Sequence, residues 1–222
     1  MLDMSTPKGR LIAAALRLGA LRPWSEITLL DIAEAAEATL MELRREFASK
    51  GDILAAFGRA VDDEVLKRIP KRTGEQAPRD RLFEVVMSRF DVLGPYKTAL
   101  HSIGRSGSLD PQLLRSLLAS QQWMLEAAGI GSEGVGGSLK AAGLAAVYAS
   151  VFRTWLEDDD PGLARTMAAL DRRLRRGEGW MNSLEDANET IRRMARALRP
   201  EARRPASPPA GSGNGSTTAE SL

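Results

Sequence analysis

Few residue types in this chain of 222 residues are able to carry covalent or metal chemistry. The chain has no cysteine and a single histidine, His101. Thiol nucleophiles and disulfides are therefore excluded, and nucleophile–base pairs and zinc sites nearly so. The acidic run 157–160 could bind a cation, but a solvated helix end followed by an N-cap explains it more simply. The sequence indicates no class of enzyme and no cofactor.

A glycine-rich segment at residues 129–134 formally matches the GxGxxG pattern of dinucleotide-binding loops. That motif needs a strand before it and a helix after it within a βαβ unit. No strand pattern precedes this segment, so we interpret it as a flexible connection, part of a glycine-rich loop expected over residues 129–137.

The elements that position the remaining polar residues are all expected to be helices. Apolar residues recur at helical spacing nearly throughout, and alternating strand patterns are absent. Thr28 opens one short helix as an N-cap, and Asp31 three residues later completes a capping box. Thr39 and Glu42 repeat the same device. The expected helices span 8–21, 29–36, 39–47, 49–69, 78–93, 96–103, 111–128, 138–156, 161–176 and 183–199.

The first of these helices carry a resemblance to a known family. Three short helices within residues 1–50, the second and third joined by a tight turn, describe a helix-turn-helix. Residues 27–36, then 43–47, then Ser49-Lys50 resemble the DNA-binding domain of the TetR family without a gap. By motif, the resemblance covers residues 1–65.

The resemblance implies an all-α, TetR-like fold. The implied order is a helix-turn-helix domain over 1–50, a connecting helix and linker over 51–77, and a helical dimerisation and ligand domain over 78–199. Residues 200–222 consist largely of Pro, Ala, Gly, Ser and Thr and have almost nothing to bury, which predicts a disordered tail.

Residues 39–47 are then implied to form the recognition helix, which a helix-turn-helix places in the major groove. The residues expected at double-stranded DNA are Thr28, Thr39, Leu40, Met41, Glu42, Arg44, Arg45 and Lys50. The threonines and basic residues would fix register on phosphates. Leu40 and Met41 could meet thymine methyl groups or be ordinary exposed side chains. Glu42 could accept from a cytosine amine or serve only as a cap, and Arg44 and Arg45 could be a solvated helix end.

Two features depart from the family pattern. Glu37 occupies the turn where the family usually has glycine. Residues 1–60 contain eight basic and eight acidic side chains, so the expected DNA-binding domain is neutral, although DNA affinity depends heavily on phosphate neutralisation.

The same fold is used by proteins of coenzyme Q biosynthesis that have lost DNA binding and hold a lipid or isoprenoid, which is the second hypothesis. A third is a protein-interaction module in which Leu40 and Met41 touch the partner.

In the TetR family the last two long helices pair with their copies in a four-helix interface. The resemblance thus implies a homodimer through residues 138–156 and 161–176, although an ordinary core helix fits the small residues of 138–156 equally well. An unknown small apolar ligand could lie against Phe90, Trp123, Tyr148 and Phe152, residue types that more often form core.

Together these features predict a ligand-responsive transcriptional regulator, a homodimeric repressor that binds DNA. No apolar run reaches the roughly 20 residues needed to span a bilayer, and no secretory signal opens the chain. The expected location is the cytoplasm, with no membrane partner.

Overall fold

A computed structural model describes residues 2–70, 76–106 and 110–177. Its elements are α1 (Pro7–Leu21), η1 (Trp24–Glu26), α2 (Leu29–Ala35), α3 (Leu40–Glu46), α4 (Lys50–Arg68), α5 (Pro78–Leu93), η2 (Gly94–Tyr96), α6 (Lys97–Arg105), α7 (Pro111–Ala127) and α8 (Gly134–Leu156), followed by a helix over 164–177. No strand occurs among the described residues, which confirms the all-α prediction. They all belong to one compact unit that spans 1–182. The expected helix 183–199 and the expected tail 200–222 lie outside the described residues.

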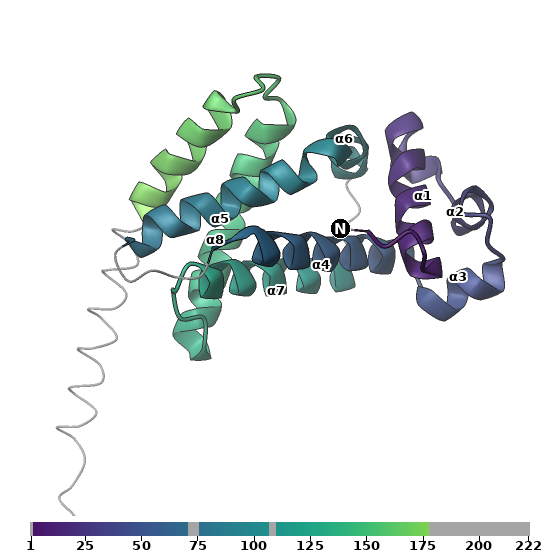
Figure 1. The fold of residues 1–222 in the computed structure, drawn as a ribbon, viewed down its shortest axis with the longest axis horizontal. Coiled ribbons are helices and arrows are strands. Elements are labelled where there is room, and N and C mark those ends of the chain that lie inside the picture. The colour runs from purple at the N-terminus through teal and green to yellow at the C-terminus, as the bar shows by residue number, and fades with distance from the viewer. Residues whose placement is uncertain (1, 71–75, 107–109, 178–222) are drawn as a thin grey trace, which may run out of the picture. The chain divides into compact units, whose positions relative to one another are not determined.

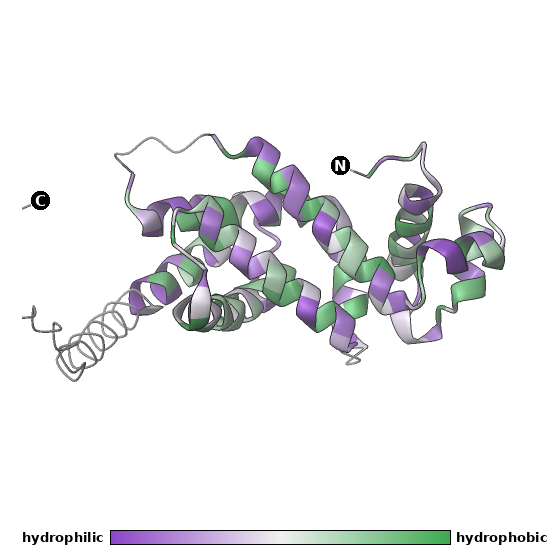
Figure 2. Ribbon diagram, turned by 90° about the horizontal axis from the view of Figure 1, so that it is seen from below, coloured by the Kyte–Doolittle hydropathy of each residue, from purple (hydrophilic) through white to green (hydrophobic). Residues whose placement is uncertain are grey.

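Near the N-terminus, α1 packs against α2, α3 and α6. Helix α4 contacts α1 and also packs against α5 and α7 (Figure 1). The described helices contain both hydrophobic and hydrophilic residues, as expected of helices that bury one face in a core (Figure 2). The core near α3 includes Leu11, Ile32, Leu43 and Phe47, each at most 5% exposed. Arg17 of α1 donates to the Ala35 carbonyl over 2.6 Å and fixes the end of α2 against α1.

Helix α8 begins earlier than the sequence pattern predicted. It starts at Gly134 instead of Ser138, because three glycines of the expected loop join its first turn. Gly137 is buried there, and a Cβ at this position would collide with the Ser132 carbonyl. The connection from α7 is correspondingly short, and its turn uses Gly129 at φ 76°. The loop prediction was therefore wrong over 134–137.

The last described helix begins later than predicted. Pro161 does not open it; Pro161 and Gly162 form a turn, and the helix starts at residue 164. Asp160 accepts from the amides of Gly162 and Ala164, both at 3.1 Å. Asp158, only 2% exposed, accepts from the Thr166 amide and hydroxyl at 2.8 and 2.7 Å. The acidic run is thus a capping structure, and no metal-binding cluster is found among the described residues.

The turn between α2 and α3 places Glu37 at φ 54°, in the left-handed region where a side chain is strained. The Ala38 amide nevertheless bonds the Ala33 carbonyl at 2.9 Å, so the turn closes α2 as a glycine-containing turn would. Glu37 therefore stands at a backbone conformation that glycine adopts more easily.

Replacing Glu37 with glycine is expected to raise the free energy of unfolding by about 1 kcal/mol, because glycine adopts this φ without a Cβ clash. Urea denaturation followed by circular dichroism measures the change. Glu37→Ala is the matched control, since it removes the same charge and keeps the Cβ. Equal stabilisation by both substitutions would show that backbone strain is not the cause.

Candidate functional site

The candidate nucleic-acid surface is the outer face of α3 and the helix ends beside it. Two capping boxes hold these ends. The Thr28 hydroxyl caps α2 by accepting from the Asp31 amide at 3.1 Å, and the Asp31 carboxylate accepts from the Thr28 amide at 2.7 Å. The hydrogen bonds that the Asp31 carboxylate accepts from the Thr28 amide, the Thr28 hydroxyl and Arg22 lower its pKa to about 2. Both expected capping boxes are confirmed.

The second capping box occupies two of the residues expected at DNA. The Glu42 carboxylate accepts from the Thr39 amide and hydroxyl at 2.7 and 2.8 Å, and the Thr39 hydroxyl accepts from the Glu42 amide at 3.2 Å. The same two bonds to Thr39 lower the pKa of Glu42. Both bonds end on the same carboxylate oxygen, Oε2, so the cap fixes the position of the Glu42 side chain at the start of α3.

Lys50 is likewise engaged within the protein. Its ammonium donates to the carbonyls of Trp24 and Ile27 at 2.9 and 2.7 Å and lies 5.0 Å from the centre of the Trp24 ring. Partial burial lowers its pKa. Lys50 thus fixes the start of α4 to the segment before α2, and a phosphate would have to share it.

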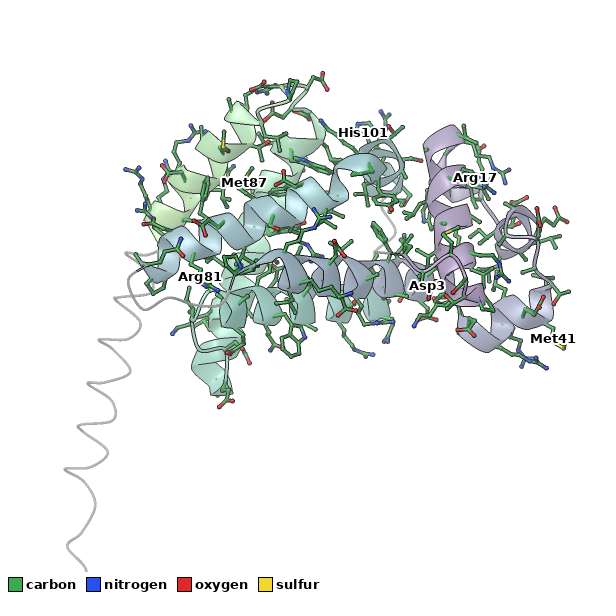
Figure 3. All side chains as sticks on the ribbon, in the orientation of Figure 1. Asp3, Arg17, Met41, Arg81, Met87 and His101 are labelled. Carbon is green, nitrogen blue, oxygen red and sulfur yellow. The ribbon has the colours of Figure 1, made fainter. Side chains whose placement is uncertain are left out.

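Four of the expected residues remain open to solvent on α3. Leu40 and Met41 are 49% and 61% exposed, and Arg44 and Arg45 are also exposed. Arg45 lies with Nη2 3.9 Å from the Met41 sulfur. Met41 projects outward from α3, away from α1 (Figure 3). Two arginines and two apolar side chains are therefore free for an external partner.

The expected ligand residues come together only in part. Phe90, Tyr148 and Phe152 join Trp155 in an aromatic ladder between α5 and α8, with ring centres 5.3 to 6.0 Å apart. Phe90 and Trp155 are at most 1% exposed, so the rings fill this space by packing on one another. Trp123 lies elsewhere: it is 58% exposed and lines a groove of about 730 Å³ beside α4 and the N-terminal segment.

A buried polar network beside this ladder was not predicted. Arg89 of α5, 3% exposed, forms an ion pair with Asp62 of α4 and donates to the Tyr148 hydroxyl at 3.1 Å. Ser120 of α7 donates to the same Asp62 carboxylate at 2.7 Å. Burial raises the pKa of Tyr148, partly opposed by the Arg89 charge. One network thereby joins α4, α5, α7 and α8. Its sequence signal was an arginine within the apolar stripe of α5.

The outer face of α8 is apolar and uncovered within the described residues. Its buried face carries residues at heptad spacing, namely Gly137, Ala141, Leu144, Tyr148, Val151 and Trp155. The opposite stripe has the same spacing and is exposed, namely Val135, Leu139, Ala142, Ala146, Ala149 and Arg153. By length and composition α8 is long and apolar enough to cross a membrane, which the sequence analysis did not predict; 28% of its most apolar window is buried, and the core helix of a soluble protein passes the same test.

Comparisons with known proteins give one family match and several structural matches. The sequence model of the COQ9 family matches residues 111–178, which contain α7, α8 and the helix after them. No curated protein matches the sequence.

Three of the solved structures that resemble this chain are described as TetR or TetR-family transcriptional regulators. One from Nitrosomonas europaea ATCC 19718 is 22% identical, with a TM-score of 0.59, and the match covers 76% of this chain and 95% of that one. One from Rhodococcus sp. RHA1 is 17% identical, with a TM-score of 0.59, and the match covers 78% of this chain and 96% of that one. One from Streptomyces coelicolor is 18% identical, with a TM-score of 0.55, over 88% and 90%. The chain therefore has the TetR fold, as the sequence resemblance predicted.

Breaking the buried ion pair is expected to destabilise the protein strongly. Asp62→Ala leaves the Arg89 guanidinium buried without a counter-ion, which lowers the free energy of unfolding by about 3–5 kcal/mol. Chemical denaturation measures the loss. The neighbouring exposed residue gives the control Asp63→Ala, expected within about 0.5 kcal/mol of the parent protein. Similar losses for the two substitutions would contradict a special role for the pair.

Proposed function

We propose that this protein is a ligand-responsive transcriptional regulator that binds double-stranded DNA as a homodimer and acts as a repressor. The observation that carries the proposal is the outer face of α3. It presents Arg44 and Arg45 without a salt bridge among the described residues, beside exposed Leu40 and Met41. A helix held by a capping box at its start and by buried Leu43 is rigid enough to enter a groove as a unit.

The exposed stripe of α8 supports the homodimer. Val135, Leu139, Ala142, Ala146 and Ala149 are small or apolar, and such a stripe in water favours burial against another helix. Small residues allow close approach of two backbones, and the heptad spacing matches shallow helix crossing. A second copy supplies the same stripe through a two-fold axis, which also provides the second recognition helix. The proposed partner helix in each copy is 164–177, which overlaps the range 161–176 expected from the sequence.

Response to a ligand would pass through α4. Lys50 fixes its start to the helix-turn-helix unit, and Asp62 ties it to Arg89 and Tyr148 beside the aromatic ladder. An apolar ligand that separates the rings of Phe90, Tyr148 and Phe152 would move Tyr148 and hence the network. Such a ligand shifts the protein between two spacings of the recognition helices only if it binds one of them more tightly.

A second candidate function is favoured by the COQ9 match over residues 111–178. In this case the chain binds a lipid or isoprenoid through its C-terminal helices and does not regulate transcription. Neutral charge over residues 1–60 and the internal commitment of Lys50, Thr39 and Glu42 are consistent with it. The two candidates differ in whether α3 meets DNA.

Removing the two free arginines tests the DNA-binding proposal. Fluorescence anisotropy is measured with the protein's own upstream intergenic DNA and with a scrambled duplex over a salt series. Arg44→Ala/Arg45→Ala is expected to weaken binding to both duplexes and to reduce the salt slope by about 2, because each lost phosphate contact removes nearly one released counter-ion. Arg115→Ala on exposed α7 is the control and should leave the slope unchanged.

Two outcomes of that experiment would redirect the proposal. An unchanged slope in the double variant would move the DNA contact away from α3. Absence of binding to every duplex, together with a lipid retained in native mass spectrometry of the purified protein, would establish the second candidate instead.

Dimer formation is tested on the exposed stripe of α8. Ala146→Glu places a charge at its centre and is expected to convert the dimer to a monomer, because an unpaired charge at an apolar interface costs several kcal/mol (roughly 2–5). Analytical ultracentrifugation reports the mass. Gln122→Glu, which adds the same charge on the exposed side of α7, should remain dimeric. A dimer that survives Ala146→Glu would place the interface elsewhere.

A further inference from the structure

We infer that the recognition helix selects its DNA site through thymine methyl groups in the major groove. The inference rests on the proposed DNA binding and adds the chemical class of base that is read. It starts from the side chains that the first half of α3 leaves free, since that half of a recognition helix meets the base edges.

The polar side chains at this end of α3 are already committed. Thr39 and Glu42 share three hydrogen bonds between 2.7 and 3.2 Å, which hold the Glu42 carboxylate at the start of α3 and lower its pKa. The two arginines follow in the last turn, after the N-terminal residues that contact base edges in a recognition helix. Leu40 and Met41 remain, 49% and 61% exposed, and Met41 points outward (Figure 3).

Leucine and methionine have no strong hydrogen-bond donor or acceptor for a base edge. Among the groups that a base pair presents in the major groove, the C5 methyl of thymine is the one that an apolar side chain contacts favourably. At a G·C pair the same side chains would cover the cytosine amine or guanine O6 and leave it without a partner, which is costly. Attraction to thymine and rejection of G·C therefore act in the same direction.

Arg45 offers the alternative to methyl recognition. Its Nη2 lies 3.9 Å from the Met41 sulfur, so its guanidinium reaches back one helical turn to the side chains at the start of α3. An arginine that read a base there would select guanine, so the composition of the selected DNA core decides between the two. Exposed apolar side chains could instead serve a protein partner, and the experiment below separates that outcome.

The experiment removes single methyl groups from DNA. Duplexes bound by the purified full chain are first selected from a randomised library, and each thymine of the selected core is then replaced by deoxyuridine, which lacks only the methyl. Binding is measured by anisotropy at fixed salt. Affinity is expected to fall about fourfold for each contacted methyl, the equivalent of one buried methyl or methylene group.

Variants locate the contact on the protein. Leu40→Ala and Met41→Ala should bind the thymine duplex more weakly and show a smaller further loss, or none, with deoxyuridine. Leu114→Ala, on α7 and 47% exposed, is the matched control and should keep the full sensitivity to deoxyuridine.

The results test two claims separately, DNA binding by the chain and recognition of thymine methyl groups. Tight binding to a selected duplex that ignores deoxyuridine, or selection of a G·C-rich core, overturns methyl recognition and leaves DNA binding intact. Failure to enrich any duplex overturns DNA binding itself and methyl recognition with it, and leaves a protein partner as the use of Leu40 and Met41.

Discussion

The ion pair between Arg89 and Asp62 is the constraint on which the arrangement of the C-terminal helices depends. Both side chains are almost fully removed from water, at 4% and 11% exposure. Each therefore needs its partner, because a buried charge left without one lowers the free energy of unfolding strongly. Ser120 and Tyr148 complete the bonding. Since the four residues come from α4, α5, α7 and α8, these helices have to meet in one register. An apolar core of leucine and alanine tolerates small sliding; a network of directional bonds does not.

That constraint gives α4 a particular mechanical role. One end of α4 is held by Lys50 to the carbonyls of Trp24 and Ile27, and its middle is held by Asp62 to the C-terminal helices. A displacement of α5 or α8 therefore moves α4 or breaks a buried charge pair, and the first costs less. The helix-turn-helix unit is positioned by α4 together with the packing of α1 on α6, where Ser102 accepts from the Trp24 amide at 3.0 Å and donates to the Arg22 carbonyl at 3.2 Å. The N-terminal helices are thus connected to the C-terminal helices in two places, through α4 and through the contact of α1 with α6. In the proposed mechanism, a bound ligand would change the relative position of these two contacts.

The sequence predicted the helices well because their signals are local. Thr28 with Asp31 and Thr39 with Glu42 are capping boxes within four residues, and both form as expected. Two helix starts were predicted wrongly although the contacts there are also local. At the start of α8 a Cβ on Gly137 would collide with the Ser132 carbonyl, and before the last described helix Asp158 and Asp160 accept from its amides. In the candidate site, local and distant contacts divide more clearly. Exposure of Met41 could be anticipated from α3 alone, whereas the capture of Lys50 by two distant carbonyls, the separation of Trp123 from the aromatic ladder and the pairing of Arg89 with Asp62 depend on segments far apart in the chain.

Charge neutrality of the N-terminal residues changes what kind of DNA binding this chain can sustain. Non-specific affinity is almost wholly electrostatic, so a unit with eight basic and eight acidic side chains and a committed Lys50 holds random DNA weakly. Contacts with base edges are less affected, because they depend on the fit of α3 and not on net charge. The ratio of specific to non-specific affinity can therefore stay high while both affinities fall, and genomic search is governed by that ratio. A second recognition helix then becomes necessary, since doubling the base contacts is the way to regain affinity without adding charge. In the proposed function, the exposed stripe of α8 and the apolar face of α3 would thus serve one requirement: a weakly charged DNA-binding protein would have to bind its site as a dimer.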